Sequence, residues 1–171
     1  YTQFSVSANG IVQLGSTVVS SSTYVASGGS TTSPKISAFA ADLGTSTTGS
    51  IKSKVIGTSP NRCLVIEFKN MTLLWVNTYP NNGTFQTRLY EDGTIEFVYG
   101  AMAIGSTTSA TDATVGIGWS IGTSANTFAY VTSSTNANTT SGTFTDNSTY
   151  ATGAITNLNT TADGSRRVYK W

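Results

Sequence analysis

Histidine is absent from this 171-residue sequence, cysteine occurs once, and charged residues make up only 10% of the chain. Without histidine, neither a His-dependent catalytic triad nor a His-ligated metal site can form. The single cysteine, Cys63, excludes an internal disulfide. No apolar run approaches the ~18 residues of a membrane-spanning helix, so we expect no such span. The formal net charge is +1 without a basic run, which argues against nucleic acid as a partner.

The polar character of the chain comes mainly from serine, threonine and asparagine, while hydrophobic residues make up 38%. Ser, Thr and Asn suit turns and sheet surfaces and are poor helix formers. No stretch has a sustained helical period, and short apolar runs alternate with turn residues. We therefore predict a single all-β domain over residues 1–171, a two-layer antiparallel β-sandwich, jelly-roll-like, with about nine or ten strands.

The segment Thr84–Tyr99, TFQTRLYEDGTIEFVY, predicts a β-hairpin around Glu91-Asp92-Gly93. Residue parity selects the turn, because a two-residue Asp-Gly loop would place Leu89 opposite Glu96. A three-residue loop with its glycine in the left-handed conformation matches residue types better. Its inward pairs are Leu89 with Ile95, Thr87 with Phe97 and Phe85 with Tyr99. The same register places Arg88 opposite Glu96, a cross-strand pair worth up to ~1 kcal/mol.

The N-terminal segment Thr2–Gly15 repeats this device. With Ala8-Asn9-Gly10 as a three-residue loop, the predicted pairs are Phe4 with Leu14, Val6 with Val12 and Ser5 with Gln13. Further strands are expected at Ile51–Ile56, Arg62–Asn70, Ala113–Ile121, Thr127–Thr132, Gly142–Thr145 and Arg166–Trp171, and Lys35–Leu43 is either a strand or a turn-bearing connector. We expect surface loops at Ser16–Ser33, with room for a short edge strand, at Thr45–Ser50 and at Ser133–Ser141.

The acidic residues and the single cysteine are the candidates for catalysis. Two carboxylates about 5–9 Å apart can hydrolyse a glycosidic bond, so a glycoside hydrolase would need a pair from Glu67, Glu91, Asp92 and Glu96. Structural roles explain these residues better, because Glu96 has Arg88 as a partner, Glu67 alternates with core residues and Asp92 is a turn residue. Cys63 is expected to be buried or half-buried and unreactive.

Asp42 is the best isolated candidate for a specific role. Its carboxylate could cap a turn, bind Ca²⁺ or be solvated, and we favour capping or solvation because no Asp-x-Asp cluster accompanies it. We expect no catalytic residue, no metal site and no cofactor.

The aromatic residues Tyr24, Trp75, Tyr79 and Trp119 are the candidate carbohydrate-binding residues. The alternative, which we favour, places such aromatics in the core of the sandwich. Two or more coplanar exposed rings among them would favour sugar binding. Five Asn-x-Ser/Thr sequences also occur, as chance predicts in a chain so rich in Asn and Thr.

Five segments, taken in order, carry a family resemblance: NGIVQLG, ISAFAADLG, SPNRCLVIEFKN, FQTRLYEDGTIEFVYG and ATVGIGW. They resemble a β-sandwich module that is widespread in large secreted and surface proteins of Bacteroidota-type bacteria, and more loosely nidogen-like extracellular domains. The resemblance is strongest over Tyr1–Trp119 and implies no catalytic residue. The chain departs from it at Ala38–Asp42, where the family usually has Pro-Phe-Trp-Asp-Asp.

The resemblance implies a non-catalytic module of a secreted or cell-surface bacterial protein, with an adhesion or structural role, for example in a filament. The alternative is a carbohydrate-binding or lectin-like module with a glycan as partner. In the family, the match to TQFSVSANG is preceded by further strands, so we expect an open sandwich edge. A partner chain or a second copy would then donate the missing strands. Alternatively, Val18–Val25 or Val168–Trp171 occupies the vacant positions.

Overall fold

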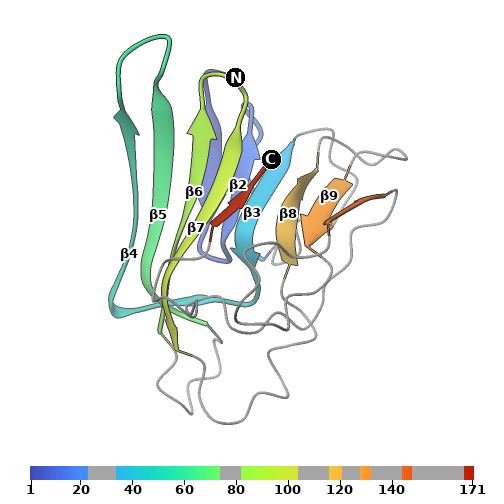
Figure 1. Cartoon of the computed structure of the whole chain (residues 1–171). Coiled ribbons are helices and arrows are strands. Elements are labelled where there is room, and N and C mark those ends of the chain that lie inside the picture. The colour runs from blue at the N-terminus through green and yellow to red at the C-terminus, as the bar shows by residue number, and fades with distance from the viewer. Residues whose placement is uncertain (23–33, 74–81, 104–115, 121–127, 132–143, 148–167) are drawn as a thin grey trace, which may run out of the picture.

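The computed structural model of the chain describes residues 1–22, 34–73, 82–103, 116–120, 128–131, 144–147 and 168–171. These residues form strands and turns, with no helix among them. The strands make two antiparallel sheets that lie in two layers (Figure 1). The predicted all-β, two-layer antiparallel sandwich is therefore confirmed.

Sheet 1 has the order β1-β2-β3-β8-β9-β10, and sheet 2 has the order β11-β7-β6-β5-β4. The strands of sheet 1 are β1 (Phe4–Ser7), β2 (Ile11–Leu14), β3 (Lys35–Ala40), β8 (Gly116–Ser120), β9 (Phe128–Val131) and β10 (Phe144–Asn147). Those of sheet 2 are β4 (Gly44–Ile56), β5 (Cys63–Thr72), β6 (Asn82–Tyr90), β7 (Ile95–Ala103) and β11 (Val168–Lys170). The described residues thus hold slightly more strands than the nine or ten predicted.

Consecutive strands mostly lie side by side, as three meanders: β1–β3, β4–β7 and β8–β10. The chain changes layer between β3 and β4, between β7 and β8, and between β10 and β11. A jelly roll combines two Greek keys, in which the fourth strand returns beside the first. The described strands of neither sheet have that order, so their connections are those of a meander sandwich rather than jelly-roll-like.

Both predicted hairpin registers are confirmed. Leu89 pairs with Ile95, Thr87 with Phe97 and Phe85 with Tyr99, and Arg88 lies opposite Glu96. In the N-terminal hairpin, Phe4 pairs with Leu14, Ser5 with Gln13 and Val6 with Val12. The glycines of the two turns adopt positive φ, +94° at Gly93 and +80° at Gly10, as a three-residue loop requires.

Two segments differ from the expectation in the β3–β4 region. Thr45–Ser50, predicted as a loop, belongs to the long edge strand β4. The pairing of β4 with β5 shifts register between Thr45 and Ser50, so this polar stretch is an irregular strand without an apolar period. The segment Lys35–Leu43 divides into strand β3 and the connector Ala41–Leu43, which combines the two alternatives.

The N-terminal loop and the C-terminal strand bear on closure of the sandwich. The described part of the loop after β2, Ser16–Ser22, contains no strand. The C-terminal strand β11 pairs antiparallel with β7 and so occupies one edge of sheet 2. The pairing places β11 at the end of sheet 2 away from β4, and filling of a vacant position by this strand stays a prediction.

The core lies between the two layers. Sheet 2 contributes Ile66, Phe68, Phe85, Phe97, Tyr99 and Tyr169, and sheet 1 contributes Val12, Ile36, Ala38, Phe39 and Ile117. Phe68 stacks on Phe85 with ring centroids 4.7 Å apart, and Phe85 contacts Phe39 of the opposite layer at 5.8 Å. The Tyr99 hydroxyl donates a hydrogen bond to the backbone oxygen of Ala38, which joins β7 to β3 across the core.

Candidate functional site

An apolar cleft of about 690 Å³ opens between the two layers. This volume falls in the range of sites that bind small molecules or protein side chains. Sheet 1 and the residues before it supply one wall, with Phe4, Leu14 and Ile36, and sheet 2 supplies the other, with Val55, Leu64, Leu89 and Ile95. We call this space the inter-layer cleft. Its walls come from inward-facing positions of both sheets, so it continues the apolar interior out to the surface.

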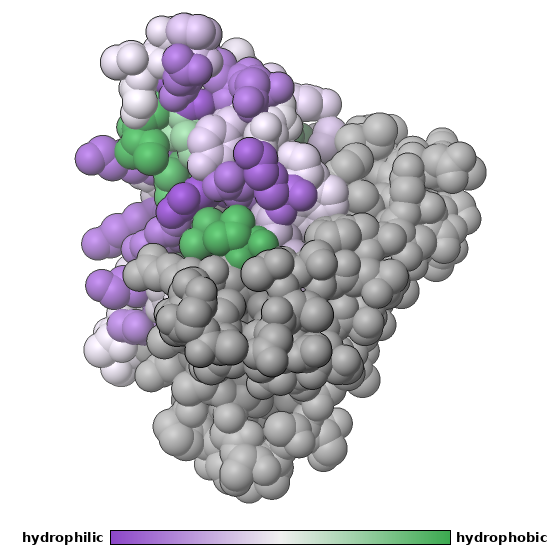
Figure 2. Space-filling view, in the orientation of Figure 1, coloured by the Kyte–Doolittle hydropathy of each residue, from purple (hydrophilic) through white to green (hydrophobic). Residues whose placement is uncertain are grey.

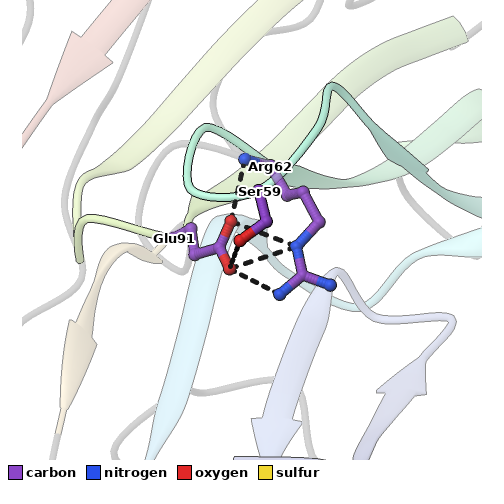
Figure 3. A network of polar contacts seen from close by, with 3 residues as sticks. All are labelled: Ser59, Arg62 and Glu91. Atoms are coloured by element: carbon purple, nitrogen blue, oxygen red, sulfur yellow. Dashed lines mark hydrogen bonds and ion pairs between the residues drawn. The ribbon is translucent and has the colours of Figure 1, made fainter.

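Glu91, which lines the inter-layer cleft, belongs to a polar cluster with Ser59 and Arg62 (Figure 3). The Glu91 carboxylate accepts hydrogen bonds from the backbone N–H of Arg62 at 3.0 Å, from its Nε at 3.1 Å and from its Nη2. Ser59 Oγ lies 3.4 Å from the same carboxylate, and Glu91 N donates to the Arg62 carbonyl oxygen at 2.9 Å. The cluster ties the β4–β5 turn to the β6–β7 turn.

The Arg62–Glu91 contact has an electrostatic consequence. Hydrogen bonds from the Arg62 side chain and backbone lower the pKa of Glu91 to about 2, from an ordinary value of 4.5. The same pairing raises the pKa of Arg62. Glu91 is therefore ionised at all ordinary pH values, and its role is that of a fixed anion rather than a proton donor.

The outer face of sheet 2 is polar, and Figure 2 shows hydrophilic side chains gathered over β4 to β7. The register aligns Lys54, Val65, Arg88, Glu96 and Lys170 in one row across the five strands. The next row contains Lys52, Glu67, Gln86, Val98 and Val168. Side-chain hydrogen bonds connect the rows, because Arg88 donates to Gln86 Oε1 at 2.7 and 2.9 Å, and Gln86 donates to Glu67 at 2.8 Å.

Each predicted carboxylate candidate has a structural partner. Glu67 accepts from Gln86, and Glu91 is held by Arg62. Glu96 accepts from the Tyr90 hydroxyl at 2.7 Å, while Arg88, its predicted partner, is 4.0 Å away and Lys170 is 3.9 Å away. Asp92 accepts from the Thr94 N–H at 2.9 Å, which lowers the pKa of Asp92. All four carboxylates therefore accept hydrogen bonds from residues of sheet 2 and its turns.

Cys63 and Asp42 show no sign of specific chemistry in the described structure. Cys63 is buried, as predicted, and burial raises the pKa of its thiol, which disfavours the reactive thiolate. Asp42 is half-buried in the connector between β3 and β4. Among the described residues, no three acidic, Cys or His side chains lie close enough to hold a metal ion together.

The side chains of the four aromatic candidates for sugar binding are not among those that the structure describes. Tyr24, Trp75 and Tyr79 lie outside the described residues, and so does the side chain of Trp119. The backbone of Trp119 lies in β8, opposite Ile36 of β3. Sugar binding by these four rings therefore stays a prediction, and a glycan-array screen of the purified chain tests it.

The sequence predicts only a turn at Asn9, whereas the structure gives its side chain two distant partners. Asn9 is buried, and its side-chain oxygen accepts a hydrogen bond from Leu43 N at 3.0 Å while its Nδ2 donates to the Ser21 oxygen at 3.0 Å. One side chain thus holds the first turn against both the β3–β4 connector and the loop after β2. The signal available in the sequence was the Asn-Gly pair, which predicts a turn but not its distant partners.

Comparison with known proteins adds one positive finding. The sequence model of the family described as NIDO related matches residues 1–169. No curated protein and no solved structure matches the chain. Within the described residues, no helix is long and apolar enough to cross a membrane. Because the match extends over nearly the whole sequence, the chain belongs to the nidogen-related (NIDO-related) family.

Proposed function

We propose that the chain is a non-catalytic module of a secreted or cell-surface protein, with an adhesion or structural role, and that its inter-layer cleft holds an apolar segment of a neighbouring chain. The observation that carries this proposal is the exposure of the cleft walls. Phe4 remains 37% exposed and Val55 55% exposed, although both line the cleft between the layers. Covering these side chains would bury apolar surface that is open to water, which favours association.

The strands beside the cleft make an extended segment a suitable occupant. In the described sheets, β1 ends sheet 1 and β4 ends sheet 2, and both contribute side chains to the cleft. A strand at a sheet edge offers backbone N–H and C=O groups to an added strand. Membership of the nidogen-related family supports the extracellular context.

Solution mass and hydrogen exchange test the docking proposal. We expect either a self-associated chain or a monomer whose amides along the edge strand Phe4–Ser7 exchange rapidly. Val55→Asp, which places a charge in the cleft, should abolish association, whereas Ile56→Asp changes the neighbouring side chain outside the cleft lining and should not. A stable monomer that is fully protected from exchange along Phe4–Leu14 would overturn the proposal.

The non-catalytic part is tested separately. We expect the purified chain to release no sugars from any polysaccharide, because its described carboxylates are engaged in structural hydrogen bonds. Reducing-end release over a panel of polysaccharides measures this. Turnover that disappears in Glu67→Gln or Glu96→Gln would show that the chain is a glycoside hydrolase instead.

A further inference from the structure

The charge on the outer face of sheet 2 is strongly one-sided. Five cations project from this face, Lys52, Lys54, Lys69, Arg88 and Lys170, against the two carboxylates Glu67 and Glu96. The whole chain has nine Lys and Arg and eight Asp and Glu residues, so the excess on this face is a local feature. The side chain of Lys170 is 65% exposed and that of Arg88 is 30% exposed, whereas that of Glu96 is only 17% exposed.

The cations of one row have a regular spacing. Lys54 lies on β4, Arg88 on β6 and Lys170 on β11, which are alternate strands of sheet 2. Neighbouring strands are ~4.8 Å apart, so their backbone positions recur at about 9.6 Å along the row. The single carboxylate of this row, Glu96, accepts a hydrogen bond from Tyr90 and lies at 4.0 Å from Arg88 and 3.9 Å from Lys170, so an anionic ligand would compete with these two long, exposed ion pairs.

A shallow hollow of about 330 Å³ lies beside this row on the same face. Its lining includes one cation, Lys69, and one carboxylate, Glu67, together with Thr84, Gln86, Val98 and Gly100. Gln86 is held by Arg88 and Glu67, and Thr84 Oγ1 accepts a hydrogen bond from Asn70 N, whereas Lys69 is exposed. A sugar ring at this hollow would place an anionic group at Lys69 and a hydroxyl group beside Thr84.

We propose that the outer face of sheet 2 binds a linear acidic polysaccharide, laid across the strands so that its carboxylate or sulfate groups meet Lys54, Arg88 and Lys170 in turn. The spacing of these cations corresponds to one anionic group per disaccharide. This site is distinct from the inter-layer cleft and from the aromatic residues considered above, and it does not depend on the function proposed for the cleft.

Two simpler explanations account for less of the pattern. Lysines on edge strands discourage edge-to-edge aggregation, which explains Lys52, Lys54 and Lys170 on β4 and β11. Protection of the sheet edges does not explain Lys69 and Arg88, which lie on the interior strands β5 and β6. Nucleic acid binding is favoured by strongly basic domains, whereas this chain has a net charge of +1 and an isoelectric point near 8.0.

The experiment measures binding of the 171-residue chain to four polymers at pH 7 over a range of salt concentrations. Hyaluronate, with one carboxylate per disaccharide, and the more densely charged dextran sulfate are the acidic polysaccharides, dextran is the neutral polymer, and single-stranded DNA is the phosphate polymer. We expect binding to at least one acidic polysaccharide, no binding to dextran and weaker binding to DNA. Affinity should fall as salt rises, because binding releases counterions.

Variants locate the site. Lys54→Gln and Lys170→Gln should each weaken binding by roughly 1.5- to 5-fold, as expected for one exposed ion pair. Each should also lower the number of counterions released on binding by about one, whereas Lys54→Arg, which keeps the charge, should bind like the parent. Val18→Glu changes the net charge by the same amount at a side chain that is 77% exposed on the loop after β2, away from sheet 2, and should have little effect.

Three results would overturn the proposal. The first is the absence of binding to both acidic polysaccharides at low salt. The second is an equal loss of affinity in Val18→Glu and the two lysine variants, which would reduce the effect to net charge. The third is tighter binding to DNA than to either polysaccharide, which would assign the face to nucleic acid. Because the substituted side chains are exposed, unchanged unfolding midpoints should confirm that the variants fold.

Discussion

Replacing Gly10 with alanine tests how tightly the first turn is packed against β3. Gly10 has φ +80°, and a Cβ atom there would lie 1.9 Å from the backbone oxygen of Phe39. A carbon–oxygen contact needs about 3.3 Å, so the turn or the strand would have to move by about 1.4 Å. Gly93 is the matched control, because it has φ +94° but no atom within 4 Å of an added Cβ.

The two glycines separate backbone strain from steric clash. Gly93→Ala should cost about 1–2 kcal/mol for the left-handed conformation alone. Gly10→Ala adds about 1–3 kcal/mol of overpacking, for a total of about 2–5 kcal/mol. With an m-value near 2 kcal/mol per molar urea, the unfolding midpoint should fall by about 0.5–1 M for Gly93→Ala and about 1–2.5 M for Gly10→Ala. Equal midpoints for the two variants would refute the close approach of Gly10 to Phe39.

Three further perturbations follow from contacts described above. Because the folded pKa of Glu91 is depressed, the stabilisation it gives is complete above the unfolded pKa of about 4.5 and is lost as the pH falls towards about 2. Thermal melts between pH 6 and pH 2 should show this loss of stability, and Arg62→Gln should abolish this pH dependence. Identical pH profiles for the two proteins would contradict the assignment. Gly93→Val should lower the melting temperature more than Asp92→Ala, because a β-branched residue is strained at positive φ by roughly 1–2 kcal/mol. Asp92→Ala removes only one exposed hydrogen bond, which Thr94 N donates to Asp92. Equal melting temperatures would count against the three-residue turn. Tyr99→Phe should reduce the free energy of unfolding by about 1–3 kcal/mol, since the buried oxygen of Ala38 loses its Tyr99 donor, and denaturant titration would expose an error here if the variant matched the parent.

The hairpin registers could be predicted because parity and turn chemistry act over a few residues. Only one loop length pairs Leu89 with Ile95, and glycine stands at the one position that needs positive φ. The strand identity of Thr45–Ser50 could not be predicted in this way. Its side chains are small and polar with no apolar alternation, so pairing with β5 makes it a strand where its own composition does not.

The candidate sites depend on contacts that the sequence does not encode locally. Arg62 and Glu91 meet because two turns lie at the same end of sheet 2. The residues next to each of them in the chain do not predict this contact. The inter-layer cleft arises from how far two sheets overlap, which no single strand specifies. By contrast, Arg88 could be placed opposite Glu96 from the hairpin register, although Tyr90 proved to make the shorter contact with Glu96.

The pairing of β11 with β7 has a consequence for how the protein acquires its structure. Trp171 and Ile95 exchange two backbone hydrogen bonds, with N–O distances of 3.0 and 3.2 Å, and Tyr169 is 1% exposed with its ring edge against Tyr99. During synthesis this edge of β7 therefore stays unpaired until Val168–Lys170 have emerged from the ribosome. Pairings between such distant segments make folding slow, because a long loop must close first. Between the synthesis of β7 and that of β11 the nascent chain consequently exposes an aromatic strand edge, and unpaired edges of this kind are prone to aggregation.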